Sequence, residues 1–206
     1  MIIWHLNINS LKTSYEYLLD CIKYATKRPD IIGLCETNNV RGRALPMIPG
    51  YRVAHNDATI GARGTAIYTR QELEMRELPI RIQLETPRDR FTAITIQEYV
   101  IIEAYAPVNS EDADERENFY MDLETIADKL AEELPNHKHI IIGDLNAHVL
   151  GCHSNETNEN GELLLRLCRN TNMTIVPLPG PTFIRGETKT IVDYILMDPG
   201  SRAELH

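Results

Sequence analysis

The feature that most constrains the fold is an apolar run, Ile140–Ile142, followed directly by the segment Gly143–His148. Consecutive β-branched residues predict a buried strand, and open α/β sheets place their ligands at the C-terminal ends of such strands. The segment carries a carboxylate, Asp144, and an amide, Asn146, which alternation along an extended chain would turn to the same side. A carboxylate can hold a metal ion or a water, and an amide can hold a phosphate oxygen. Taken alone, Gly-Asp after a strand is equally an ordinary turn.

Four further apolar runs carry polar side chains at or near one end. These are residues 2–6, followed by Asn7 and Asn9; residues 30–35, followed by Glu36; residues 99–104, followed by Tyr105; and residues 191–196, which contain Asp193. A charged group within an apolar strand is costly to bury unless it is paired or binds a metal. Each residue alone could be a satisfied polar group of the core, but the set of five indicates a functional site where strand ends meet.

The rest of the chain predicts helices and strands in alternation. Apolar residues recur at helical spacing in three segments, residues 11–26, 112–134 and 160–170. Between residues 51 and 104, glycines and turn residues separate successive strands. The pattern predicts a single α/β domain over residues 1–206, with two mixed sheets packed face to face and helices outside.

Composition favours a soluble globular protein, with 43% hydrophobic and 25% charged residues. No run approaches the ~18–20 apolar residues of a membrane span, so we expect no membrane association. The four cysteines lack the spacing of metal ligands, and Cys152-His153 with His148 does not match the usual zinc patterns. We therefore expect reduced thiols in an intracellular protein.

The net charge of −9 is unusual for a protein that binds nucleic acid. Residues 98–133 hold twelve Asp/Glu and two Lys/Arg, a balance of −10, whereas residues 41–97 hold six and nine, a balance of +3. We expect the acidic segment to form a solvated outer helix face. Six arginines would remain available for phosphates: Arg41, Arg43, Arg63, Arg70, Arg88 and Arg90. Binding would be weak and sensitive to salt.

Taken in order, these motifs resemble the endonuclease/exonuclease/phosphatase superfamily, and within it the apurinic-type endonuclease domain of non-LTR (LINE-type) retrotransposons. The matching segments are Leu6–Asn9, Leu34–Thr37, Gly64–Tyr68, Tyr105–Pro107, Gly143–Asn146, Gly180–Phe183 and Val192–Tyr194. Each motif is short, but seven in sequence are specific, and Gly-Pro-Thr-Phe favours the retrotransposon branch. The resemblance implies a four-layer α/β sandwich.

The resemblance also implies roles for individual residues. Glu36 would be the main ligand of a divalent metal with Asn7 beside it, and such oxygen ligands suit Mg²⁺ or Mn²⁺. Asp144 would align or deprotonate the attacking water, and Asn146 would bind the phosphate or fix Asp144. Tyr105 would donate its hydroxyl to a phosphate oxygen or stabilise the leaving group as a phenolate.

Residues expected to contact DNA lie mainly in loops. They are Asn9, Arg41, Arg43, Thr182, Arg185 and Lys189. The loop Arg185–Lys189 lies between two predicted strands and could be a hairpin that enters the minor groove, where width and A·T content are read. A plain polar turn explains the same residues equally well.

One motif of the family is absent. In the family, Asp193 orients a histidine of a C-terminal Ser-Asp-His motif, and this chain contains no Ser-Asp-His. The domain is therefore expected to lack its last strand, to have lost its catalytic base, or to use another histidine. His148 is the preferred substitute because it continues the alternation of the strand end, His206 is a second candidate, and His5 is expected to point away. A missing strand would leave a neighbouring edge open for pairing with a second chain.

The leading hypothesis is a divalent-metal-dependent DNA endonuclease of a non-LTR retrotransposon. It would act in the nucleus as part of a polyprotein with reverse transcriptase, nicking one strand of double-stranded DNA to leave a 3′-hydroxyl. A second hypothesis keeps the fold but changes the substrate, to an abasic site, RNA or another phosphoester. A third is an inactive relative that only binds nucleic acid or protein. Loss of Ser-Asp-His favours the third hypothesis, and retention of the polar residues at the strand ends favours the first.

Overall fold

The computed structural model describes residues 1–40, 43–59, 63–186 and 188–199, and places two mixed sheets face to face. The four-stranded sheet has the order β1 (Ile3–Asn7), β2 (Ile31–Cys35), β4 (Thr65–Arg70), β3 (Tyr51–Asn56). The six-stranded sheet has the order β5 (Met75–Glu77), β6 (Phe91–Ile96), β7 (Tyr99–Tyr105), β8 (Lys138–Asp144), β12 (Asp193–Met197), β9 (Thr174–Ile175). The helices are α1 (Leu11–Tyr24), α2 (Ala113–Glu133) and α3 (Glu159–Asn170), with one 3₁₀ turn, Arg88–Arg90.

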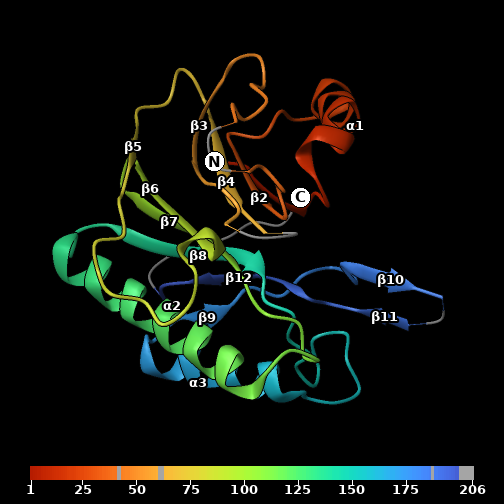
Figure 1. Cartoon of the computed structure of the whole chain (residues 1–206), viewed down its shortest axis with the longest axis vertical. Coiled ribbons are helices and arrows are strands. Elements are labelled where there is room, and N and C mark those ends of the chain that lie inside the picture. The colour runs from red at the N-terminus through yellow and green to blue at the C-terminus, as the bar shows by residue number, and fades with distance from the viewer. Residues whose placement is uncertain (41–42, 60–62, 187, 200–206) are drawn as a thin grey trace.

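Three apolar clusters hold the layers together. Between the sheets, isoleucines such as Ile31, Ile67 and Ile142 interdigitate. On the outer face of the four-stranded sheet, α1 buries Leu11 and Leu18, while α2 and α3 cover the outer face of the six-stranded sheet. Figure 1 shows α1 on one side of the two sheets and α2 and α3 on the other. The predicted four-layer α/β sandwich is therefore confirmed.

Both sheets are mixed because each contains one parallel pair. β1 pairs with β2 in parallel, and β7 pairs with β8 in parallel, whereas the other neighbours are antiparallel. The short strand β5 and the hairpin of β10 (Phe183–Arg185) and β11 (Thr188–Thr190) complete the fold. The hairpin projects from the body of the molecule (Figure 1), so the hairpin interpretation of this region is confirmed.

Strand β1 lies at the edge of its sheet, because within the described ranges it pairs only with β2. A cavity of about 340 Å³ lies beside it, lined by Ile3, Trp4, His5, Leu6, Leu178, Thr182, Asp193, Tyr194 and Ile195. Among the described helices, none is long and apolar enough to cross a bilayer.

Candidate active site

The pairing of the strands brings the polar strand ends together. Tyr105, at the end of β7, and Asp193, at the start of β12, are both the register partners of Asp144 at the end of β8. In the other sheet, Asn7 at the end of β1 is the register partner of Cys35, which directly precedes Glu36. Since the two sheets face each other, these ends meet at one side of the sandwich.

Glu36 is held by two donors. Its Oε1 atom accepts a hydrogen bond from the Asn7 amide nitrogen at 2.8 Å and from the Tyr105 hydroxyl at 2.6 Å. The backbone of Glu36 has φ of 51°, in the left-handed region that non-glycine residues rarely adopt. Such strain persists where surrounding contacts enforce it and is common at functional sites.

Tyr105 remains a protonated donor. Burial, followed by the hydrogen bond to Glu36 and its charge, raises the pKa of the Tyr105 hydroxyl well above its usual value. Of the two roles that the sequence left open, donation of the hydroxyl is therefore favoured over a phenolate.

Asp144 is only 6% exposed, and its carboxylate accepts hydrogen bonds from the Asn7 amide nitrogen at 3.0 Å and from the backbone N–H of Asn146 at 3.1 Å. Burial and the charge of Asp193 raise the pKa of Asp144 to about 6, against the lowering effect of the Asn7 bond. Gly143 is required before it, since a Cβ there would lie 2.0 Å from the Ala104 carbonyl oxygen.

The position of Asn146 corrects one sequence argument. The strand ends at Asp144, and Asn146 adopts φ of 47° in a turn, so strand alternation does not explain why both side chains line the cleft. The Asn146 amide nitrogen donates to the Ala106 carbonyl at 2.9 Å, and its backbone N–H fixes Asp144. The expected pairing with Asp144 is therefore present, but the turn creates it.

A cleft of about 650 Å³ opens over these groups. It is lined by Asn7, Glu36, Tyr105, Val108, Asn109, Asp144, Asn146, His148, Glu156, Asn158, Thr182, Phe183, Val192 and Asp193. The cleft thus unites all six residues to which the sequence assigned catalytic or metal-binding roles.

His5 corrects a second sequence argument, because it does not point away from the site. Positions 5 and 7 of one strand share a face, and the His5 ring lies between two carboxylates. Its Nδ1 atom is 3.2 Å from Glu103 Oε2, and its Nε2 atom is 3.0 Å from Asp193 Oδ1. His148, the preferred substitute, lines the cleft but is held through its backbone N–H by Asn158. Within the described residues, His5 is thus the histidine that contacts Asp193.

Glu103 is the residue that the sequence reasoning missed. It lies within the apolar strand β7, is fully buried, and has a pKa raised to about 7 by burial, against the lowering effect of His5. Burial lowers the pKa of His5, but the charge of Glu103 and the hydrogen bonds with Asp193, Cys35 and Glu103 outweigh it and raise that pKa well above 6.5. A carboxylate in the middle of an apolar strand was the available signal, since it demands a partner.

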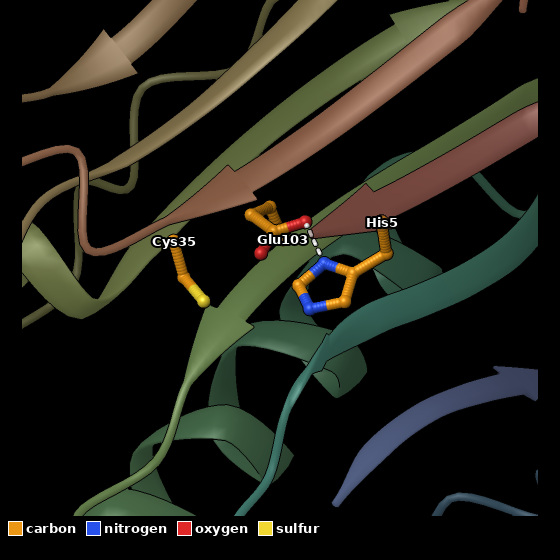
Figure 2. A group of neighbouring side chains, drawn as sticks. All are labelled: His5, Cys35 and Glu103. Carbon is orange, nitrogen blue, oxygen red and sulfur yellow. Dashed lines mark hydrogen bonds and ion pairs between the residues drawn. The ribbon is translucent and has the colours of Figure 1, made fainter. Parts of the chain in front are cut away.

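Cys35 completes this buried group. Ligand-type atoms of His5, Cys35 and Glu103 lie within 4.8 Å of one another, and Figure 2 shows the Glu103 carboxylate and the Cys35 sulfur both directed toward the His5 ring. Burial raises the pKa of the Cys35 thiol far above its usual value, so the sulfur stays a thiol and the ring is satisfied by the two carboxylates.

The residues expected to contact DNA are more dispersed. Thr182 lines the cleft, and its hydroxyl accepts the backbone N–H groups of Val192 and Asp193 at 3.1 and 3.2 Å. Asn9 donates its N–H to the Asn7 side-chain oxygen and so supports that residue. Lys189 is exposed on β11 and Arg185 belongs to β10 of the projecting hairpin, while Arg43 is exposed near residue 40. Arg41 and His206 lie outside the described residues.

The expected separation of acidic and basic surfaces is wrong in part. Arg90 is 1% exposed and forms ion pairs with Glu111 and Glu115, and Glu115 also pairs with Arg63. Other arginines are engaged as well: Arg70 pairs with Asp30 and Glu72, and Arg88 donates to backbone carbonyls. The acidic segment therefore neutralises arginines that were expected to meet phosphates.

The site fits a hard divalent cation. One amide nitrogen, that of Asn7, lies within 3.0 Å of carboxylate oxygens of both Glu36 and Asp144. The carboxylates of Glu36 and Asp144 therefore converge on the Asn7 side chain, which also carries an amide oxygen. Mg²⁺ and Mn²⁺ prefer such a set of carboxylate and amide oxygens.

Comparison with known proteins places this geometry in context. The sequence model of the family described as Endonuclease-reverse transcriptase matches residues 99–204. The comparison with curated proteins gave no match.

Three solved structures are similar over nearly the whole chain. The 3′-5′ exonuclease NExo from Neisseria meningitidis has a TM-score of 0.71 at 19% identity, covering 97% of this chain and 87% of that one. The AP endonuclease LMAP from Leishmania major has a TM-score of 0.75 at 14% identity, covering 96% and 78%. The endonuclease domain of TRAS1, a telomere-specific non-LTR retrotransposon, has a TM-score of 0.69 at 17% identity, covering 96% and 84%. At these identities the likeness shows a common fold.

Proposed function

The chain belongs to the endonuclease–reverse transcriptase family, and from this premise we propose that it is a divalent-metal-dependent DNA endonuclease of a non-LTR retrotransposon. It nicks one strand of double-stranded DNA and leaves a 3′-hydroxyl that primes reverse transcription. The observation that carries the proposal is the convergence of Glu36, Asp144 and the Tyr105 hydroxyl around the Asn7 amide. The similarity to the TRAS1 endonuclease domain supports the choice of substrate.

The roles of the residues follow from their geometry. Glu36 and Asn7 would hold Mg²⁺ or Mn²⁺, which when bound supplies Lewis-acid activation of the phosphate. Asp144 accepts a proton from the attacking water, whose oxygen forms the new bond to phosphorus. The bond between phosphorus and the 3′-oxygen breaks, and the 3′-oxygen takes a proton from solvent water to become the 3′-hydroxyl. Asn146 fixes the Asp144 carboxylate through its backbone N–H. Tyr105 donates its hydroxyl to a phosphate oxygen, stabilising charge that develops in the transition state.

The hairpin is the proposed DNA reader. β10 and β11 project beside the cleft, and two apolar side chains of β10 are exposed, Phe183 at 42% and Ile184 at 63%. Phe183 also lines the cleft. Apolar side chains of this kind can wedge into the minor groove, and the exposed Lys189 of β11 would meet a flanking phosphate. We further propose that the domain works in the nucleus within a polyprotein that carries reverse transcriptase.

Nicking of supercoiled plasmid with Mg²⁺ or Mn²⁺ tests the proposal, with Glu36→Ala as the test variant. Glu117→Ala, which removes an exposed carboxylate on α2, is the matched control. We expect the wild type and Glu117→Ala to convert the plasmid to open circles. Glu36→Ala, and the wild type in the presence of EDTA, should not convert it. Cleavage confined to oligonucleotides with an abasic site would instead assign the second substrate class. Equal nicking by Glu36→Ala would reject the site.

A further inference from the structure

We propose that His5 is a positioning residue for Asp193, holding its carboxylate at the cleft from the side opposite to the substrate. The inference rests on the proposed function and extends it to a residue outside the cleft lining. His5 comes from β1 of one sheet, whereas its partners Glu103 on β7 and Asp193 on β12 come from the other. The ring therefore ties the two sheets together directly behind the active site.

Glu103 fixes one side of the ring. Its carboxylate is fully buried, its Oε2 atom faces His5 Nδ1 at 3.2 Å, and its Oε1 atom has no hydrogen-bond partner. The backbone makes room for it at Gly33, where a Cβ would lie 2.1 Å from Glu103 Oε2. A buried carboxylate is costly unless it is paired, and among the described side chains His5 is its hydrogen-bond partner. With Nδ1 held by Glu103, Nε2 is directed at Asp193.

Asp193 transmits this constraint to the cleft. Its side chain and Thr182 line both the catalytic cleft and the cavity beside β1, whereas His5 lines only the latter. Its backbone N–H is fixed by the Thr182 hydroxyl, and its Cα faces that of Asp144 across the β8–β12 pair. Among the described residues, the Asp193 carboxylate has a side-chain hydrogen bond with His5 and with no other group. Without His5, rotation of the Asp193 carboxylate would be free.

The variant His5→Ala tests this role. Removing a residue that orients an active-site group costs about 10–100-fold in activity, so kcat for nicking should fall by that factor while KM changes by less than about threefold. The matched control is His55→Ala, which removes a second histidine–aspartate pair, His55 with Asp57, on β3. This control should leave kcat unchanged.

Chemical rescue separates positioning from a merely structural role. Truncation of His5 enlarges the cavity beside β1, which Asp193 also lines, so added imidazole can occupy the place of the ring. Imidazole should restore nicking by His5→Ala in a saturable way, without restoring Asp193→Ala. A kcat within threefold of wild type in His5→Ala would overturn the inference. A loss that imidazole does not restore, in parallel with a lower melting temperature, would overturn it equally.

A second readout does not depend on activity. In protein labelled with ¹⁵N-histidine, the ring signals of His5 should shift in Glu103→Gln and in Asp193→Asn. If the wild type does not nick DNA but these shifts occur, the proposed function fails, while the contacts of His5 with Glu103 and Asp193 are supported. If the His5 ring signals are unchanged in both variants, the proposed contacts of His5 with Glu103 and Asp193 are overturned. A metal ion that co-purifies with the protein and is lost in Cys35→Ser would also overturn the inference, by making His5 a ligand.

Discussion

Replacing Asp144 by asparagine should stabilise the protein while abolishing its activity. In the folded chain the Asp144 carboxylate is 6% exposed, and burial and the charge of Asp193 raise its pKa from 3.8 to about 6. Each pKa unit corresponds to about 1.4 kcal/mol. The difference of about two units therefore lowers the free energy of unfolding by about 3 kcal/mol when Asp144 is ionised. Asparagine removes that cost, but its amide nitrogen faces the amide nitrogen of Asn7, which costs about 1 kcal/mol. We expect a net gain of about 2 kcal/mol at pH 8.

The pH dependence gives the prediction its sign. Because the pKa of Asp144 is higher in the folded than in the unfolded chain, the folded state binds more protons between about pH 4 and pH 6. The contribution of Asp144 to wild-type stability therefore falls as the pH rises through this window, and its loss is complete above the window. Asp144→Asn does not titrate here, so its advantage over wild type should be about 1.5 kcal/mol larger at pH 8 than at pH 5. Glu103 and His5 are present in both proteins, so their contributions largely cancel in the difference.

Urea unfolding in EDTA at pH 5 and pH 8 measures this difference without a bound metal. Glu117→Gln, at an exposed position on α2, controls for the loss of one negative charge and should change the free energy of unfolding by less than about 0.5 kcal/mol. Added Mg²⁺ should then stabilise the wild type in proportion to its occupancy and Asp144→Asn far less. Equal destabilisation of Asp144→Asn at both pH values would refute the reasoning, because it would mean that the carboxylate is favourably solvated.

Three further predictions concern other parts of the molecule. Gly33→Ala should lower the free energy of unfolding by about 1–3 kcal/mol, since its Cβ would lie 2.1 Å from Glu103 Oε2. The same substitution should cost less in a Glu103→Ala background. If the losses from Gly33→Ala and Glu103→Ala were additive, the clash between the two residues would be contradicted. Tyr105→Phe should reduce kcat for nicking by about 10²–10³-fold with little change in the melting temperature, because within the described part of the chain its hydroxyl bonds only to Glu36. Full activity would exclude the donor role. Among the described strands, β1 pairs only with β2, and a free strand edge favours self-association. Light scattering should then show dimers as concentration rises, and a monomer throughout would count against pairing at this edge.

The layered fold could be predicted because its signals are local. Runs of β-branched residues and helical apolar stripes located the long strands and helices to within a few residues. The short strand β5 was missed, since three residues of mixed polarity, Met75–Glu77, give no periodic signal. The strand ends that the sequence singled out, at Asn7, Glu36, Tyr105, Asp144 and Asp193, do lie around one cleft. Their juxtaposition could be predicted because each lies where a strand begins or ends, whereas their catalytic roles stay a prediction.

The charge network could not be predicted in the same way, because its partners are far apart in sequence. His5 and Asp193 are separated by 188 positions, and His5 and Glu103 by 98. The expectation that His5 points away was wrong, because positions 5 and 7 of one strand share a face. Even with the correct face, only the packing of the two sheets reveals which carboxylates His5 meets. The pairing of Arg90 with Glu111 and Glu115 likewise depends on how α2 approaches the end of β7.

If the proposed function is right, the cleft would have to attract DNA with very little positive charge of its own. Among the described residues that line it, none is lysine or arginine, whereas Glu36, Asp144, Glu156 and Asp193 are acidic. A phosphate would be repelled by such a surface unless a cation held by Glu36 and Asn7 offset the negative charge, so metal and DNA should bind with positive cooperativity. The remaining affinity would come from the projecting hairpin and from a tethered partner that raises the effective concentration. An acidic chain with a net charge of −9 is thus consistent with the proposed nuclease, for which a bound divalent metal and a tethered partner would supply the affinity for DNA.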